Sequence, residues 1–401
     1  MMRRDCLALL SAGVTAPGWA AGGCGAQWPL WESFASIFIQ PDGRVVDAST
    51  PQKHSSSEGQ SYGMFFALVA NDRTRFDALW RWSVNNLMGG QVQGRLPAWW
   101  WGLAPDNTWR VLDGNSASDA DLWFTYALLE AARLWKVPAY ERDARLLLAE
   151  IEKREVVDVP GLGPMLLPGE FGFVHHNPER WVFNPSYQPP PVLRRLVSAS
   201  PVGPWDAIAR NTETLYQGAT QPNGFAPDWV SYTLDSGTDA AGKARGSFGP
   251  HPEKGDVGSY DAIRTYLWAG MTPRADTLAA PLRTALAGQL RATALAGQPP
   301  ESVVVSTAVT QGTGSFGFSA AMLPLLSATG QTAALARQRR RVADGLAQAL
   351  APQNLQQRQP PYYDLVLSLF GQGWLDRRYQ FTRSGALAPA WTSPCRAIPL
   401  L

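Results

Sequence analysis

Three acidic side chains stand where a carboxyl group could take part in proton transfer. Glu58 lies in the run HSSSEGQSYGM, Asp119 in SASDADLW and Asp261 in GSYDAIR, and each run leads into a segment with helical spacing. Catalysis by a general acid and a general base needs one carboxyl that holds a proton and another that is ionised. The three positions are therefore candidates for an acid, a base and a supporting carboxylate.

The surroundings of Glu58 and Asp261 suit opposite protonation states. Glu58 precedes a largely apolar helix, and a carboxyl held near buried aromatic rings has its charged form disfavoured and its pKa raised. Arg264 follows Asp261 by one helical turn, and its positive charge would keep Asp261 ionised. Simpler explanations fit as well: a helix cap at Glu58, and an ion pair at i, i+3 between Asp261 and Arg264.

A pair of acids, Asp119 and Asp121, opens a long amphipathic pattern that ends near residue 135. Apolar residues recur in it at i, i+3, i+4 and i+7, which is the spacing of one helical face. Ser116 or Ser118 is the expected N-cap, and the helix dipole favours acids in a first turn by about 0.3–1 kcal/mol each. Support of the helix start explains Asp121, whereas the other two candidate acids give Asp119 a second interpretation.

Helical spacing recurs along the whole chain and predicts an all-α fold of stacked helical hairpins. The segments expected to be helical are 28–38, 62–70, 75–87, 119–135, 142–154, 191–196, 204–216, 260–269, 275–293, 319–326, 332–350 and 362–370. Short segments such as 303–307 could be strands, but none alternates long enough to predict a large sheet.

Long loops fall at alternate helix junctions, so we expect them to gather on one face and to line a groove. These loops are 88–115, 155–190, 217–258 and 294–318, and they are rich in Trp, Tyr and Phe. The piece 237–258 is expected to be a surface insertion without a chemical role.

Composition restricts the class of protein. The 401 residues show no break into two blocks, so residues 22–401 are expected to form one domain, whose 45% hydrophobic content suits a sizeable core. A net charge of +2 with interspersed signs gives no indication of nucleic-acid binding. The 17 tryptophans exceed ordinary usage, and flat aromatic rings suit the stacking of sugars, although many must belong to the core.

The sequence carries no metal or nucleotide signature. Its four histidines lack ligand spacing with cysteines or acids, and the adjacent His175 and His176 are expected at the surface. No P-loop, dinucleotide fingerprint or nucleophile elbow is present. We therefore expect neither a metal nor another cofactor, and a site built from carboxylates among aromatic rings.

Residues 1–21 are typical of a secretory signal peptide, because a basic MMRR start is followed by a short apolar stretch and by small residues for cleavage. The stretch is too short to span a membrane, so we expect release into the periplasm or beyond. The arginine pair leaves a twin-arginine route open. If cleavage retains Cys24, its only candidate disulfide partner in an oxidising compartment is Cys395, and the sequence leaves open whether the two pair.

An acid, a base and aromatic platforms together are what hydrolysis of a glycosidic bond requires. The runs SEGQSYGM, ASDAD followed by LLEAARLW, and YDAIR resemble glycoside hydrolase family 8. The similarity extends over nearly the whole mature chain through RLPAWWWG, PGLGPMLLPG, FNPSY, GFSAAMLPLL and LFGQGW. Within the family the chain is most similar to the endoglucanases encoded with bacterial cellulose synthase, from which the 237–258 insertion departs.

The resemblance implies an (α/α)6 barrel and hydrolysis of β-1,4-glucan with inversion. On the matching positions it makes Glu58 the general acid and Asp261 the general base. It makes Asp119 the carboxylate of the central subsite, which orients the distorted sugar and which some descriptions of the family call the nucleophile. The residues implied for substrate binding are Trp99, Trp101, Tyr187, Arg264 and Tyr362.

The resemblance also implies cellulose chains as the polymer partner and the cellulose synthase and export complex as a candidate protein partner. Two other functions fit the same residues. One is hydrolysis of another β-glycan of the family, such as xylan, chitosan or mixed-linkage glucan. The other is a non-catalytic glucan-binding component of the secretion machinery, against which the presence of all three carboxylates argues.

Overall fold

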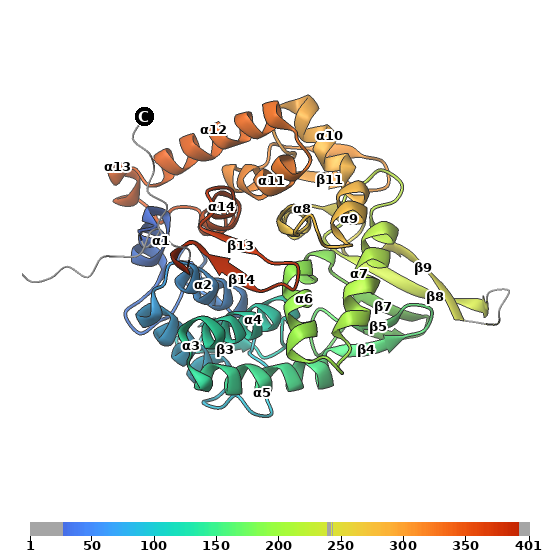
Figure 1. The fold of residues 1–401 in the computed structure, drawn as a ribbon, viewed down its shortest axis with the longest axis horizontal. Helices are drawn as coiled ribbons and strands as arrows, with labels where there is room; N and C mark the ends of the chain where they lie inside the picture. Colours follow the sequence, from blue (N-terminus) through green and yellow to red (C-terminus); the bar gives the residue numbers. More distant parts are fainter. Residues whose placement is uncertain (1–26, 239–241, 243, 393–401) are drawn as a thin grey trace, which may run out of the picture.

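α-Helices are the main regular elements of the structure, a computed structural model that describes residues 27–238, 242 and 244–392 (Figure 1). The helices in this part are α1 (Pro29–Phe38), α2 (Ser57–Val69), α3 (Arg73–Leu87), α4 (Ser118–Trp135), α5 (Pro138–Arg154), α6 (Pro190–Ala199), α7 (Trp205–Ala219), α8 (Ala262–Met271), α9 (Ala279–Ala285), α10 (Ala287–Ala296), α11 (Phe316–Ala328), α12 (Thr332–Ala349), α13 (Pro352–Leu355) and α14 (Tyr362–Leu375). The helices expected from the sequence are present, although the one predicted over 275–293 is split into α9 and α10.

Consecutive helices pack in pairs: α2 with α3, α4 with α5, α6 with α7, α8 with α9, and α11 with α12. One helix of a pair is deeply buried and its partner faces outward. Every residue of α8 is buried, whereas the outer α12 buries only Ala334, Gln338 and Val342. A helix that is apolar all round requires burial on all sides, so α8 and the similarly apolar α11 can only lie inside.

Inner helices α8, α11 and α14 approach one another closely enough for backbones to touch. A Cβ atom at Gly270 of α8 would overlap the backbone of Leu325 in α11, and one at Gly371 of α14 would overlap the carbonyl of Ala320. Glycine is therefore required at these two contacts, because any larger residue would push the helices apart.

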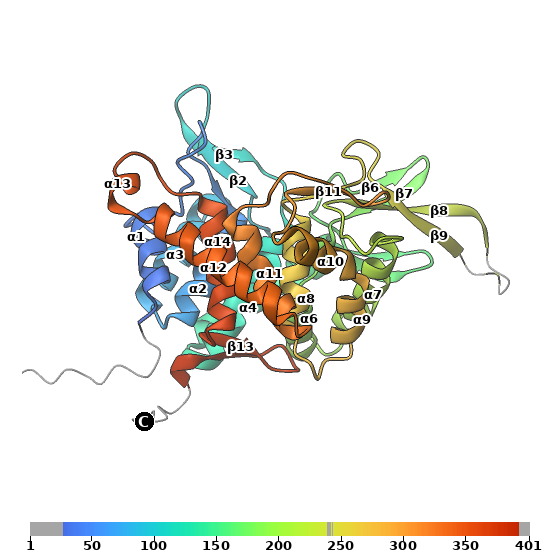
Figure 2. The ribbon, with the colours of Figure 1, turned by 90° about the horizontal axis from the view of Figure 1, so that it is seen from above.

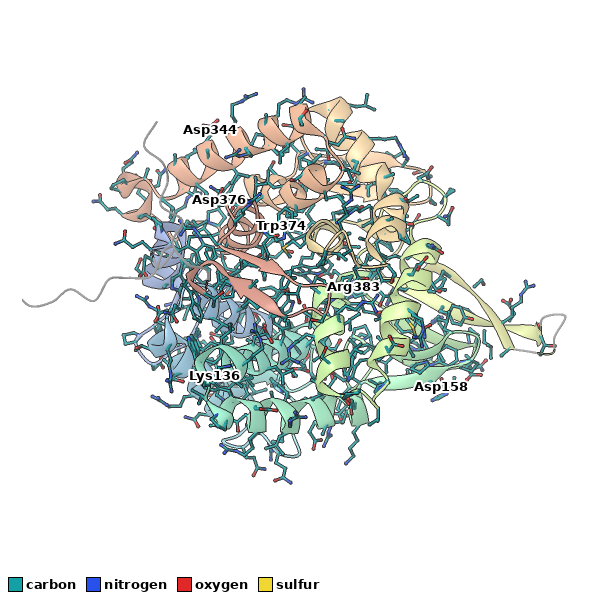
Figure 3. The ribbon with its side chains drawn as sticks, in the orientation of Figure 1. Lys136, Asp158, Asp344, Trp374, Asp376 and Arg383 are labelled. Carbon is teal, nitrogen blue, oxygen red and sulfur yellow. The ribbon has the colours of Figure 1, made fainter. Side chains whose placement is uncertain are left out.

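Aromatic rings from four inner helices meet in the core. Trp123 of α4 lies 5.4 Å from both Trp268 of α8 and Phe370 of α14, measured between ring centroids, and Tyr62 of α2 lies 4.9 Å from Phe370. Figure 3 shows side chains filling the space that the helices enclose. Large buried rings of this kind supply much of the hydrophobic stabilisation of a helical domain.

The strands lie mainly at one end of the helices. They are β1 (Ser55–Ser56), β2 (Trp100–Leu103), β3 (Trp109–Asp113), β4 (Val156–Val159), β5 (Gly163–Leu166), β6 (Val174–His176), β7 (Glu179–Phe183), β8 (Val230–Thr238), β9 (Ala244–Pro250), β10 (Val257–Gly258), β11 (Ser302–Val304), β12 (Val309–Gln311), β13 (Tyr379–Phe381) and β14 (Leu387–Pro389). In Figure 2, β2, β3, β6, β7 and β11 lie along the upper edge and β13 along the opposite edge. The expected gathering of the long loops on one face is thus what the structure shows.

The expectation of an all-α fold is only partly right, because the described residues also form antiparallel sheets. Strands β6, β7, β8 and β9 build a four-stranded antiparallel sheet, and β9 comes from the segment predicted to be a loop insertion. The alternation of Val230, Tyr232 and Leu234 is typical of a strand. The Gly, Ser and Asp residues that follow Leu234 favour a loop, although the structure places the first of them in β8. Pairing with the neighbouring strands overrides these weak local preferences.

A hairpin of β13 and β14 covers the opposite end of the helices (Figure 2). Its anchor is Glu130 of α4, a fully buried carboxylate that accepts the amide hydrogen of Leu387 at 2.7 Å. Arg133 and Arg195 each pair with Glu130 at 2.5 Å. Two cations and a backbone amide thus satisfy a carboxylate that burial alone would destabilise.

None of the described helices combines the length and apolarity that crossing a membrane would require. The predicted signal peptide, residues 1–21, and the predicted pair Cys24 and Cys395 lie outside the described residues.

Candidate active site

Glu58, Asp119 and Asp261 converge on the guanidinium group of Arg264. Glu58 Oε2 lies 3.0 Å from Nη1, Asp261 Oδ1 lies 2.9 Å from Nη2, and Asp119 Oδ2 lies 3.6 Å from Nη2. The side chain of Arg264 is only 5% exposed. Three helix starts far apart in the sequence thus place their carboxyls around one buried cation, as expected for a shared site.

The local structure around Glu58 holds it in the first turn of α2. Ser56 caps this helix by accepting the amide hydrogen of Gly59 at 3.0 Å, and the amide of Ser57 donates to the carbonyl of Trp99 at 3.0 Å. The first contact starts the helix and the second ties it to the segment that leads into β2. The acid therefore lies beside that segment.

Tyr362 of α14 packs between this first turn of α2 and helix α1. Its ring packs on Phe34 and Phe38 of α1, with centroids 6.0 and 5.3 Å away. A Cβ atom at position 59 would lie 2.6 Å from the Tyr362 hydroxyl oxygen, so Gly59 is what lets the tyrosine reach the turn of Glu58.

The start of α4 differs from its prediction, because neither Ser116 nor Ser118 caps the helix. Ala117 is the N-cap residue and offers no side-chain acceptor. Ser118 donates its backbone amide hydrogen to the carbonyl of Pro168 at 2.9 Å, so the loop after β5 holds the first turn. Asp119 accepts the amide hydrogen of Ala120 at 2.8 Å, which fixes the orientation of its carboxyl.

Burial raises the pKa of Asp119 well above its usual range, and the charge of Glu58 raises it further, whereas Arg264 lowers it. Asp119 Oδ2 is buried and has no hydrogen-bond partner among the described residues. The site therefore keeps a proton at pH values where an exposed carboxyl would have lost it.

Asp121 belongs to a second, deeper carboxyl pair. Its partner is Glu155, which precedes β4, and both side chains are fully buried. Ser116 donates its hydroxyl hydrogen to Glu155 at 2.6 Å. Burial raises the pKa of Glu155 to about 7 and that of Asp121 well above its usual range, and the charge of Glu155 raises the pKa of Asp121 further. The sequence did not point to Glu155, which follows a helix with no distinguishing neighbours.

Asp228 is a further residue that sequence reasoning missed. Its Oδ1 accepts the amide hydrogens of Ser259, Asp261 and Ala262 at 2.8, 3.0 and 2.7 Å. Its Oδ2 accepts the hydroxyl hydrogen of Ser259 at 2.5 Å. Asp228 thus caps α8 from a distant loop and fixes the backbone that carries Asp261. Burial raises the pKa of Asp228, and the neighbouring Asp261 raises it further.

Hydroxyl and aromatic groups complete the surroundings of Arg264. The Tyr187 ring, at the end of the short helix η1 (Pro185–Tyr187), lies 5.8 Å from the guanidinium carbon. Arg264 donates to the hydroxyl of Tyr363 at 3.2 Å and to that of Ser186 at 3.3 Å. Tyr363 in turn donates to the carbonyl of Tyr260 at 2.7 Å. These contacts hold the cation in one orientation among its three carboxyls.

Tryptophans extend from the neighbourhood of Glu58 along the hairpin of β2 and β3. Trp99 is 37% exposed and stacks on Trp100. Trp101 packs edge-on against Trp82, stacks on Trp109 at 5.4 Å and contacts the guanidinium of Arg44 at 4.4 Å. Trp109, which the sequence reasoning passed over, is 46% exposed.

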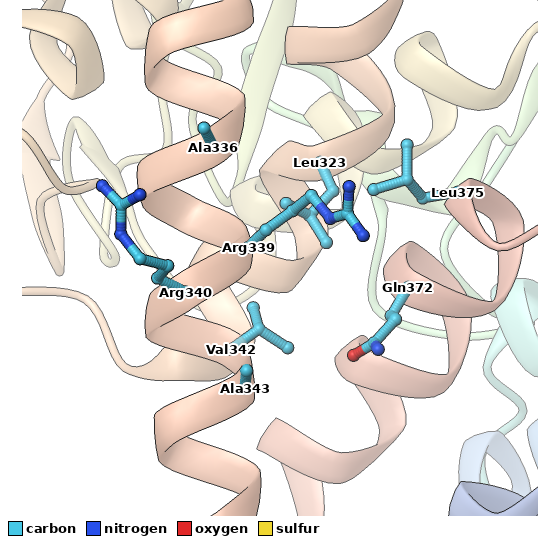
Figure 4. A pocket seen from close by; sticks show the side chains of 8 residues that line it. All are labelled: Leu323, Ala336, Arg339, Arg340, Val342, Ala343, Gln372 and Leu375. Atoms are coloured by element: carbon cyan, nitrogen blue, oxygen red, sulfur yellow. The ribbon is translucent and has the colours of Figure 1, made fainter.

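A pocket of about 340 Å³ lies on the outside of the molecule between α11, α12 and α14, away from this site (Figure 4). Its lining includes Arg339, Arg340 and Gln372, and none of the three carboxyls that surround Arg264. Among the described residues no group of three or more His, Cys, Asp or Glu side chains could hold a metal ion. The local countercharge of the carboxyl cluster is Arg264.

Comparison with known proteins identifies similar chains. A model of the glycosyl hydrolases family 8 matches residues 11–377. An endoglucanase of Pseudomonas fluorescens (strain SBW25) is 47% identical over 396 residues, which cover 97% of this chain and 98% of that protein. An endoglucanase of Escherichia coli (strain K12) is 45% identical over 368 residues, 92% of each chain. The crystal structure of an endo-1,4-D-glucanase from Vibrio fischeri ES114 superposes with a TM-score of 0.83 at 39% identity, covering 92% of this chain and all of that one.

Proposed function

The chain belongs to glycoside hydrolase family 8, and from that premise we propose that it is an inverting endo-β-1,4-glucanase that cuts cellulose chains internally. The observation that carries this proposal is the convergence of Glu58, Asp119 and Asp261 on Arg264. Hydrolysis of a glycosidic bond requires a protonated and an ionised carboxyl on opposite sides of the bond.

In the proposed mechanism Glu58 gives its proton to the leaving oxygen, and the bond from that oxygen to the anomeric carbon breaks. Asp261 takes a proton from water, whose oxygen bonds to the anomeric carbon from the opposite face, so the configuration inverts. Inversion needs the two carboxyls roughly 6.5–9.5 Å apart to admit the water. Glu58 and Asp261 contact different nitrogens of Arg264.

We assign Asp119 to the central subsite, where it hydrogen-bonds the reacting sugar. Its position supports this role, because it lies 3.6 Å from Arg264, beside the other two carboxyls, and is almost completely buried. An inverting reaction forms no bond between enzyme and sugar, so in this mechanism Asp119 is not a nucleophile.

The residues assigned to substrate binding divide by their surroundings. Exposure supports Trp99 as a sugar platform, and Tyr187 is close enough to Arg264 to contact the reacting sugar or its water. Trp101 and Tyr362 already pack against protein side chains, so we assign them the support of Trp109 and of the Glu58 turn. Arg264 acts on the substrate through the three carboxyls that it orients.

We propose that the fold is an (α/α)6 barrel. The inner helices would be α2, α4, α6, α8, α11 and α14, and the pairing of five of them with outer partners supports this arrangement. The sixth pair would be α14 with α1, which are in contact.

We further propose that the enzyme acts outside the cytoplasm, in the periplasm or beyond, on cellulose that the synthase and export complex delivers. The signal-like residues 1–21 support export, and the resemblance to endoglucanases encoded with cellulose synthase supports the setting.

The test is release of reducing ends from carboxymethylcellulose by the purified mature protein, with xylan, chitosan and mixed-linkage glucan alongside. Glu58→Gln and Asp261→Asn should each abolish release while thermal unfolding stays close to that of the unaltered protein. Proton NMR of the first products should show the α-anomer. Turnover by either variant at the unaltered rate would contradict the assigned role, and binding without any turnover would favour a glucan-binding protein.

A further inference from the structure

The sheet of β6, β7, β8 and β9 has one apolar face and one polar face. Trp181, Tyr232 and Phe248 stand opposite one another across three strands and belong to an apolar cluster that packs on α7. Side chains alternate between the faces of a strand, so Arg180 and Thr233 lie on the other face. The other face is therefore available for contacts outside the core.

Positive charge collects on this other face. His175 and Arg180 are directly opposite each other on β6 and β7. Together with Lys254, from the loop after β9, they lower the pKa of His251, which burial lowers most, while Glu253 acts in the opposite direction. Basic side chains thus outnumber acidic ones around His251.

Two of these basic groups have no partner of opposite charge. In the described part of the chain neither Arg180 nor Lys254 forms an ion pair, and Arg180 Nε is buried without any hydrogen-bond acceptor. A buried guanidinium N–H without an acceptor is destabilising, and an incoming anion would supply the missing acceptor.

A row of aromatic rings joins this charged face to the carboxyl cluster. Tyr187, beside Arg264, lies 6.0 Å from Trp229 between ring centroids. Trp229 lies 6.3 Å from His251, and Lys254 Nζ lies 3.8 Å from the centre of its ring. A glucan chain that leaves the reacting sugar along these rings would pass directly under Lys254.

Resting on the proposed function, we propose that Trp229, Lys254 and Arg180 form a subsite for a glucosyl unit that carries an anionic substituent, a carboxylate or phosphate group. The sugar ring stacks on Trp229 and displaces Lys254 from it. The ammonium and guanidinium groups then pair with the anion. The loss of one exposed cation–π contact is small beside the gain of two charge-assisted hydrogen bonds. The 237–258 segment, expected to have no chemical role, supplies Lys254.

The test compares an anionic with a neutral soluble cellulose. Lys254→Met, Arg180→Met and the double variant are assayed on carboxymethylcellulose and on hydroxyethylcellulose, at low salt and at about 1 M NaCl, where the Debye length is about 3 Å. Lys153→Met, which removes one exposed charge on α5, is the matched control. At low salt, the double variant should lose kcat/KM relative to the unaltered protein on both polymers. The loss on carboxymethylcellulose should be about tenfold larger than the loss on hydroxyethylcellulose, which is equivalent to about 1.4 kcal/mol.

High salt should remove this difference, and Lys153→Met should leave the ratio between the two polymers unchanged. Equal losses on both polymers, or no loss on the anionic one, would overturn the subsite while leaving the enzyme an endoglucanase. Lys254→Met tests the same ratio if the partly buried Arg180 proves necessary for folding. Inactivity of the unaltered protein on both polymers would instead remove the proposed function, and the subsite with it.

Discussion

Asp228 Oδ1 accepts the backbone amide hydrogen of Asp261 at 3.0 Å, so one acid holds the backbone of another. The two carboxyls face different partners. The Asp228 carboxyl accepts hydrogen bonds from the first turn of α8, and the Asp261 carboxyl accepts one from Arg264. Asp228 therefore acts through position and not through contact with substrate.

Replacing Asp228 should reduce turnover more than substrate affinity. Asp228→Ala removes the acceptor for three backbone amides, and a shift of the base by about 1 Å can cost about 100-fold in rate. We expect kcat to fall by about that factor with little change in KM, and thermal stability to fall by about 1 kcal/mol. Asp228→Asn, which keeps an acceptor oxygen, should recover part of kcat. A rise in KM at constant kcat would contradict the positioning role.

Arg264→Lys should nearly abolish activity although it conserves charge. An ammonium group is a single point charge and cannot contact Glu58, Asp119 and Asp261 in fixed directions as the guanidinium does. We expect kcat to fall at least about 100-fold, a typical cost of losing preorganised electrostatics. Arg264 lowers the pKa of Asp119, so Asp119 in Arg264→Gln should hold its proton to higher pH. Carboxyl NMR titration would measure this, and an unchanged titration would contradict it.

The buried pair of Asp121 and Glu155 should make stability depend on pH. The pKa of Glu155 rises from 4.5 to about 7 on folding, so the folded protein keeps a proton that the unfolded chain loses between these values. Stability contributed by the bound proton is complete below pH 4.5 and is lost as pH rises through about 7, a change of about 3 kcal/mol. Chemical denaturation across this range should show the decline.

Glu155→Gln should flatten that decline, because an amide does not titrate. Its stability relative to the unaltered protein should improve as pH rises from 4.5 to about 7. Parallel stability curves for the two proteins would contradict the assignment of this titration to Glu155.

Trp109→Ala should weaken binding of long glucan chains and spare short ones. Trp109 is exposed and stacks on Trp101, so it offers a platform at a distance from the carboxyls. One lost stacking contact of about 0.5–1.5 kcal/mol raises KM by about two- to tenfold. Kinetics on a series of cello-oligosaccharides should place the change only in the longer members; a uniform change would indicate a folding defect.

Glu130→Gln should destabilise the protein without altering the chemistry of the site. The variant leaves Arg195 buried beside a neutral amide, and breaking a buried ion pair on one side costs about 3–5 kcal/mol. The unfolding temperature should drop clearly while kcat at low temperature stays the same. An unchanged unfolding temperature would show that the β13–β14 hairpin does not depend on this anchor.

The sequence predicts the inner helices well because their burial leaves a strong apolar pattern, as in the segment that becomes α4. It also predicts that Glu58, Asp119 and Asp261 belong together, through family motifs. Asp228 could not be predicted, because it is 33 residues from Asp261 and its role depends on a loop returning to a helix start. Ser116 is the opposite case, a residue whose predicted role as helix cap is wrong. Its sequence position suits a cap, but the buried Glu155 offers its hydroxyl a better partner.

The backbone contacts at Gly270 and Gly371 have a mechanical consequence. Helices that touch through their main chains have no soft side chains between them to compress, so α8, α11 and α14 form a stiff frame. Asp261 precedes the first turn of one of these helices, so we expect its backbone to keep its place when substrate binds. The glucan chain deforms more easily than this frame. We therefore expect the site to fit a sugar ring that is already distorted toward the transition state. Stiffness of the scaffold thus selects the shape of the sugar.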